Sequence, residues 1–136
     1  MKHHKLSPEL SRRAENAEPG VTHLQADVTD ETQVNAAVAE ILRREGRIDI
    51  LINNAGFGIS GAIEFTPPQE ARRQFDVNFF GMVNMNHAVL PVMRQQGGGR
   101  IVNLSSVAAP APIPFQAWYS VTKAAINAYA LALRNE

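Results

Sequence analysis

The sequence IDILINNAG at residues 48–56 decides the fold of this chain. Its apolar run, from Ile48 to Ile52, is short and is followed directly by the turn-forming residues Asn53, Asn54 and Gly56. A short apolar run bounded by turn residues is typical of a strand buried in a parallel sheet. We therefore predict a strand over residues 48–52 with a polar turn at its carboxyl end.

Strands and helices alternate on both sides of this run. Apolar residues recur at helical spacing after Asp30, and a longer helical stretch is expected to bend near Asn78 and to be disturbed at Pro91. The predicted order is strand 21–26, helix 31–45, strand 48–52, helix 67–96, strand 100–106 and helix 116–135.

Two of the predicted helices carry start signals. Asp30 is a candidate N-cap with Gln33 three residues later, which is the spacing of a capping box. Thr66 repeats the pattern with Pro67 at the first helical position and Gln69 at the third. We therefore expect one helix to begin after Asp30 and another after Thr66.

Alternating strands and helices imply right-handed crossovers and a parallel sheet with helices on both faces. The predicted fold class is therefore α/β with a doubly wound parallel sheet, incomplete because only three strands are recognisable. Residues 1–20 are predicted to form a polar N-terminal arm and residues 21–136 a partial domain. Ligands of such sheets bind at the carboxyl ends of the strands, where Asp27, Asn54 and Ser106 lie in this sequence.

Composition excludes several classes of protein. The 136 residues carry 13 basic and 13 acidic side chains, a net charge of zero, so we expect neither nucleic acid nor a membrane surface as a partner. Cysteine is absent, and His3 and His4 have no further ligands near them, so we expect no metal site. No segment resembles a secretory signal, and we expect a cytoplasmic location.

Three glycines form a pattern that is a weak signal for a phosphate-binding loop. Gly56, Gly58 and Gly61 match GxGxxG and follow a predicted strand. Phosphate binding needs such glycines to open a helix, yet the next helix start is Thr66, five residues after Gly61. The spacing therefore favours a flexible loop beside a substrate site over a phosphate loop.

A serine, a tyrosine and a lysine form a candidate catalytic group. Tyr119 and Lys123 are four residues apart and share a helix face, while Ser106 precedes Tyr119 by thirteen residues at a strand exit. A lysine cation stabilises a phenolate, so the pair can move a proton while the serine hydroxyl donates to a substrate oxygen. Each element alone is also typical of a half-buried ring, a solvated amine or a turn serine.

Five motifs together resemble the short-chain dehydrogenase/reductase family. They are DVTD at 27–30, DILINNAG at 49–56, FDVNFFG at 75–81, GRIVNLSS at 99–106 and YSVTK at 119–123. The resemblance extends from about Pro19 to Glu136 and keeps the family's order. It implies a Rossmann-like fold and an oxidoreductase that interconverts an alcohol and a carbonyl by hydride transfer with NAD or NADP.

The resemblance also implies catalytic roles. Tyr119 would be the general acid/base, and Lys123 would tune it and hydrogen-bond the nicotinamide ribose. Ser106 would polarise the substrate oxygen, and the family's spacing favours it over Ser105. Asn78 would hold a water that links Lys123 to solvent, whereas its plain interpretation is a polar residue in a helix bend.

Cofactor-binding residues follow from the same resemblance. Asp27 and Val28 would flank the adenine, and Asn54, Ala55 and Gly56 would lie near its ribose, while Tyr119 and Lys123 would meet the nicotinamide end. Arg12 lies where the family's second strand would end, and an arginine there can pair with a 2′-phosphate, which favours NADP over NAD. A solvated charge in the arm is the alternative for Arg12.

Two parts of the family's pattern are missing, the glycine-rich phosphate turn and the later strands. We therefore expect this stretch to bind the cofactor weakly and to have little activity. The resemblance implies a small-molecule alcohol or ketone as substrate and a homo-oligomer formed through the helices at 67–96 and 116–135. The alternative is a catalytically silent fragment, or an interaction protein that self-associates through the same helices.

Overall fold

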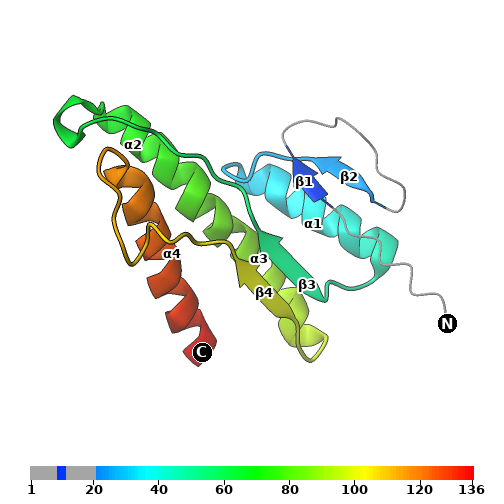
Figure 1. The fold of residues 1–136 in the computed structure, drawn as a ribbon. Coiled ribbons are helices and arrows are strands. Elements are labelled where there is room, and N and C mark those ends of the chain that lie inside the picture. The colour runs from blue at the N-terminus through cyan, green and yellow to red at the C-terminus, as the bar shows by residue number, and fades with distance from the viewer. Residues whose placement is uncertain (1–8, 12–20) are drawn as a thin grey trace.

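The computed structural model describes residues 9–11 and 21–136. Strands and helices alternate along this part of the chain, as the sequence predicted (Figure 1). Their bounds are Glu9–Ser11 (β1), His23–Gln25 (β2), Glu31–Glu45 (α1), Ile50–Asn53 (β3), Ile63–Phe65 (η1, a 3-10 helix), Pro68–Phe75 (α2), Asp76–Phe80 (η2, a π-helix), Gly81–Gln95 (α3), Arg100–Asn103 (β4) and Ala117–Asn135 (α4).

All strand pairs in the described residues are parallel. β1 pairs with β2 and β3 with β4, with Leu51 opposite Ile101. The predicted incomplete Rossmann-like α/β fold is therefore confirmed, and the described residues hold one strand beyond the three that the sequence predicted. The additional strand, Glu9–Ser11, lies inside the segment 1–20 that was predicted to be a polar arm. Three residues are too few to show a period, so only pairing with β2 reveals this strand.

One predicted helix start is right and the other is displaced. The carboxylate of Asp30 accepts hydrogen bonds from two backbone N–H groups of the first turn of α1, and Gly46 ends the helix with a left-handed φ of 74°. Thr66 does not cap α2, because that helix begins at Pro68 with Pro67 at the N-cap position. The Thr66 hydroxyl instead donates to the carbonyl of Ala62, 3.0 Å away, and closes the short helix η1.

The bend predicted near Asn78 is a π-helical segment. Residues Asp76–Phe80 (η2) join α2 to α3 without a break, and Asn78 is 1% exposed within this segment. π-helical turns inside longer helices are frequent at functional sites. Pro91 lies inside α3, which continues to Gln95, so the predicted disturbance does not end the helix.

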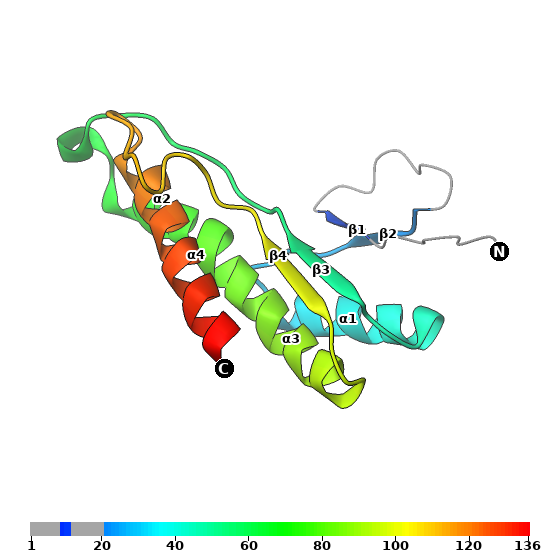
Figure 2. The same ribbon diagram turned by 60° about the horizontal axis from the view of Figure 1, so that its bottom comes forward.

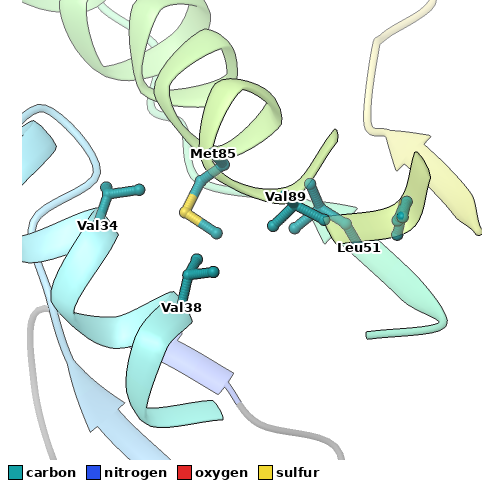
Figure 3. Packing of buried hydrophobic residues seen from close by; sticks show 6 residues of the cluster. Val34, Val38, Leu51, Met85 and Val89 are labelled. Atoms are coloured by element: carbon teal, nitrogen blue, oxygen red, sulfur yellow. The ribbon is translucent and has the colours of Figure 1, made fainter. Parts of the chain in front are cut away.

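The hydrophobic core lies between two helices and one face of the β3–β4 sheet. Figure 2 shows α1, α3 and α4 on the same side of these strands. On the opposite side Ile50 is 52% and Ile52 61% exposed, so the described helices cover one face. No helix among the described residues is long and apolar enough to span a bilayer. The core residues, drawn in Figure 3, are Val34, Val38, Leu51, Met85, Val89 and Met93.

Candidate active site

A pocket of about 480 Å³ lies where β3 and β4 end and α4 begins. This is the carboxyl edge of the parallel strands, where α/β folds bind ligands. The volume is within the usual range for small-molecule sites. Its lining residues are Asn54, Gly56, Phe57, Gly58, Leu104, Ser105, Gln116, Tyr119 and Lys123.

Tyr119 and Lys123 share one face of α4 and both line this pocket. The ammonium nitrogen of Lys123 lies 5.6 Å from the centre of the Tyr119 ring. Lys123 is only 5% exposed, and its Nζ donates a 2.7 Å hydrogen bond to the carbonyl of Leu104 at the exit of β4. A buried cation needs such a partner, which here also fixes the ammonium beside the phenol ring.

Two glycines contribute bare backbone to the pocket beside the tyrosine. Gly56 and Gly58 are exposed, and an added Cβ on Gly58 would lie 3.7 Å from a Tyr119 ring carbon. Glycine lets a ligand approach the backbone closely because no side chain intervenes. Among the described residues no group hydrogen-bonds to the Tyr119 hydroxyl, so it is available to a substrate.

Asn78 uses its side chain to hold the loop that follows β3. Its Oδ1 accepts from the N–H of Phe57 at 2.9 Å, and its Nδ2 donates to the carbonyl of the same residue at 2.9 Å. Nδ2 also donates to the Thr122 hydroxyl at 3.2 Å, and that hydroxyl donates to the carbonyl of Tyr119. Asn78 therefore connects the loop to α4, and both of its N–H groups are engaged by protein atoms.

The two serines after β4 have different partners. The Ser105 hydroxyl donates to the carbonyl of Lys123 at 3.2 Å, so its proton is used by α4. Ser106 Oγ accepts from the N–H of Ala108 at 3.1 Å and keeps its own proton available. Ser105 lines the pocket, and Ser106, the next residue along the chain, is not among its lining residues.

The residues predicted to bind the cofactor are spread over two places. Asn54 and Gly56 line the pocket, and Ala55 between them is exposed without lining it. Asp27 lines a second, polar depression of about 500 Å³ beside η2, and Val28 packs against the core. Arg12, His3 and His4 lie outside the described residues.

Sequence analysis missed the polar groups that support this edge of the sheet. Asn53 Nδ2 donates to Asn86 Oδ1 at 2.9 Å and to Asn103 Oδ1 at 2.8 Å, which joins the ends of β3 and β4 to α3. Gln74, 0% exposed, donates to the carbonyl of Phe57 at 2.9 Å. Its position one helical turn before Asn78 was the only signal in the sequence.

Comparisons with known proteins agree with this architecture. A family model described as short chain dehydrogenase matches residues 3–136. The 3-ketodihydrosphingosine reductase of Bacteroides thetaiotaomicron is 47% identical over 116 residues, which are 85% of this chain and 43% of that protein. The chain thus spans less than half of this curated relative's length.

Solved structures match over most of the described chain. A short-chain dehydrogenase from Streptomyces avermitilis superposes with a TM-score of 0.88 and 33% identity, over 94% of this chain and 51% of that one. A gluconate 5-dehydrogenase from Burkholderia cenocepacia, solved with NADP and tartrate, superposes with a TM-score of 0.77 and 34% identity. That match covers 81% of this chain and 43% of the other. Together with the family match over residues 3–136, these likenesses show that the chain belongs to the short chain dehydrogenase family.

Proposed function

We propose that this chain carries the proton-transfer site of a nicotinamide-dependent oxidoreductase that interconverts an alcohol and a carbonyl. One observation carries the proposal: Tyr119 and Lys123 line one pocket at the carboxyl edge of the strands, together with the exposed backbone of Gly56 and Gly58. A phenol beside a fixed ammonium can give a proton to a forming alkoxide and take it back in the reverse direction.

Each proposed catalytic residue has a separate task. Tyr119 exchanges the proton with the substrate oxygen, and the Lys123 ammonium, 5.6 Å from the ring centre, stabilises the phenolate. Ser106 would donate its unused hydroxyl proton to the same oxygen, which requires its hydroxyl to turn towards the pocket. Asn78 holds the loop through Phe57, and the proposed water link to Lys123 would use its remaining acceptor capacity.

The pocket residues offer hydrogen-bond donors for the ribose of a nicotinamide nucleoside and leave room for it beside the backbone. Lys123 uses one N–H on Leu104, so its ammonium keeps two for ribose hydroxyls, and Gly56 leaves the backbone open beside Asn54. A bound nicotinamide would supply or accept the hydride. NADP is favoured because it is bound in the gluconate 5-dehydrogenase neighbour, and Arg12 remains the proposed partner of its 2′-phosphate.

The loops beside the pocket favour an apolar substrate. Residues 104–118 contain no charged side chain, and the N–H of Gly61 joins the two loops by a 2.8 Å bond to the carbonyl of Phe115. The relative from Bacteroides thetaiotaomicron is named for reducing a 3-ketodihydrosphingosine. We therefore propose a carbonyl compound with a hydrocarbon chain. The exposed large apolar residues of η1 and of residues 104–118 are Ile63, Phe65, Leu104, Val107, Ile113 and Phe115.

The test compares the two tyrosines of the chain, both in α4. We expect the wild-type chain to oxidise NADPH with 2-decanone slowly, measured by absorbance over long incubation, and Tyr119→Phe to lower kcat at least about 100-fold, the usual contribution of a general acid. Tyr129→Phe is the matched control and should keep the wild-type rate. Equal rates for wild type and Tyr119→Phe would exclude the assigned acid.

A catalytically silent, self-associating chain is the second candidate. It is favoured by exposed apolar side chains on the helices, where Phe80 is 51%, Val121 48% and Leu131 63% exposed. Titration with NADPH, followed by energy transfer from Trp118, separates the two functions. A folded chain that forms oligomers in light scattering but neither binds nor oxidises NADPH would support the silent function.

A further inference from the structure

Two buried amide side chains hold one peptide unit of the loop that lines the pocket. Gln74 at the end of α2 and Asn78 in η2 are 0% and 1% exposed and lie one helical turn apart. The carbonyl of Phe57 accepts from both, each at 2.9 Å, and the N–H of Phe57 donates to Asn78. Both acceptor positions of this carbonyl are thereby filled by side chains from one helical segment.

Phe57 is the residue that these bonds hold within the short segment Gly56–Gly58, whose two glycines are exposed. Phe57 is half-buried between Gly56 and Gly58, and all three line the pocket. The guanidinium of Arg73 lies 5.4 Å from the Phe57 ring centre and adds a cation–π contact. A Cβ added to Gly58 would be in van der Waals contact with the Tyr119 ring. Since Phe57 is bonded to Gly58, movement of Phe57 also changes the space beside the phenol.

Gln74 is a costly residue for a purely structural position. Its Oε1 is buried and has no hydrogen-bond partner among the described residues, while its Nε2 is used on Phe57. A buried acceptor without a partner is unfavourable, and an apolar side chain of similar shape would avoid that loss. The amide donor is therefore the property that distinguishes Gln74 from leucine or methionine at this buried site.

Asn78 cannot take over this donation. One of its N–H groups already points at Phe57 and the other at the Thr122 hydroxyl, 3.2 Å away, which links the loop to α4. Gln74 adds a second donor to this carbonyl from α2, which packs against α4 as Figure 1 also shows. Without it, the carbonyl of Phe57 would pivot about Asn78 alone.

We infer that Gln74 is a positioning residue that fixes the Gly56–Gly58 loop against Tyr119 through the carbonyl of Phe57. Its effect on turnover rests on the proposed function, whereas its effect on the loop does not. The decisive measurement is therefore spectroscopic and can be made without any substrate.

The chain has two tyrosines, and 3-fluorotyrosine labelling gives each a separate ¹⁹F signal. In Gln74→Met we expect the Tyr119 signal to shift or broaden, while Tyr129, which packs edge-on against Phe79, keeps its position. Amide hydrogen exchange at Phe57 should become about tenfold faster, the effect of losing one net hydrogen bond of ordinary strength. Gln69→Met, at an exposed position of the same helix, is the matched control and should change neither.

Gln74→Glu provides a conservative rescue if Gln74→Met unfolds. A buried carboxyl favours its neutral form, which has one O–H donor for Phe57, so the wild-type Tyr119 signal should return at low pH and be lost when the carboxyl ionises. An unchanged Tyr119 signal and unchanged Phe57 exchange in folded Gln74→Met, or in Gln74→Glu at a pH where the carboxyl is ionised, would overturn the inference. So would equal changes in the Gln69 control.

Turnover separates this inference from the proposed function. With NADPH and 2-decanone, Gln74→Met should lower kcat/KM about tenfold and Gln69→Met should not. A wild-type chain without turnover would count against the proposed function alone, because the ¹⁹F comparison still decides the role of Gln74.

Discussion

Two glycines of the pocket loop offer a matched pair of substitutions. Gly56 and Gly58 are both exposed, neither has a positive φ, and Gly→Ala is the same chemical change at each. An added Cβ on Gly56 would lie 3.1 Å from Oδ1 of Asn78, whereas on Gly58 the nearest atom is a Tyr119 ring carbon at 3.7 Å. The first distance forces a shift of the neighbour and the second is ordinary contact.

The expected effects on stability follow from these contacts. Replacing glycine by alanine where the backbone permits it stabilises by about 0.4–1 kcal/mol through the unfolded state. Gly58→Ala should show this gain. Gly56→Ala has the same gain from the unfolded state, but its Cβ displaces the Asn78 amide that holds Phe57. A disturbed buried hydrogen bond costs about 1–3 kcal/mol. The two variants should therefore differ by about 1–3 kcal/mol.

Urea unfolding measures this difference directly. Trp118 is the only tryptophan and lies beside Tyr119, so its fluorescence and far-UV circular dichroism should report the same transition. In an Asn78→Ala background the contact is gone, and the penalty of Gly56→Ala should disappear in a double-mutant cycle. Equal unfolding midpoints for Gly56→Ala and Gly58→Ala, or a penalty that persists without Asn78, would show that the contact with Asn78 does not set the difference.

Two further predictions concern α1. Asp30→Ala removes the N-cap side chain and should destabilise the chain by about 1 kcal/mol in thermal unfolding, while Asp30→Asn should keep most of the stability because its amide oxygen still accepts. Hydrogen bonds from Arg43, and then from Arg44, lower the pKa of Glu40 to about 2 from 4.5. A lowered carboxyl pKa stabilises the folded state above pH 4.5, and this contribution disappears as the pH falls towards 2. The difference in unfolding midpoint between wild type and Glu40→Gln should therefore shrink over that range; a constant difference would contradict the assignment.

The sequence predicted the helices and the longer strands because their signals are local. The cap at Asp30 and the helical spacing of apolar residues after it, from Val34 to Ile41, depend on neighbours within two turns, and both were confirmed. The strand β1 and the true start of α2 were missed. β1 is recognisable only from its pairing with β2. The start of α2 is displaced because the Thr66 hydroxyl donates to the carbonyl of Ala62 and not to the first turn of α2.

The pocket, too, was predictable in part from local sequence and depends in part on tertiary contacts. From residue order alone, Tyr119 and Lys123 were known to share a helix face, and Asn54 and Gly56 to follow a strand. That these four line one pocket is a property of the tertiary structure, because β3 and α4 are separated by more than sixty residues.

Only the fold could show how Asn78 and Gln74 are used. Sequence spacing placed them one turn apart, but not which backbone group they reach or that Ser105, and not Ser106, lines the pocket. Periodicity records which residues share a face of one element. Which atoms fill the hydrogen-bonding capacity of a buried side chain depends on elements that meet only when the chain is folded.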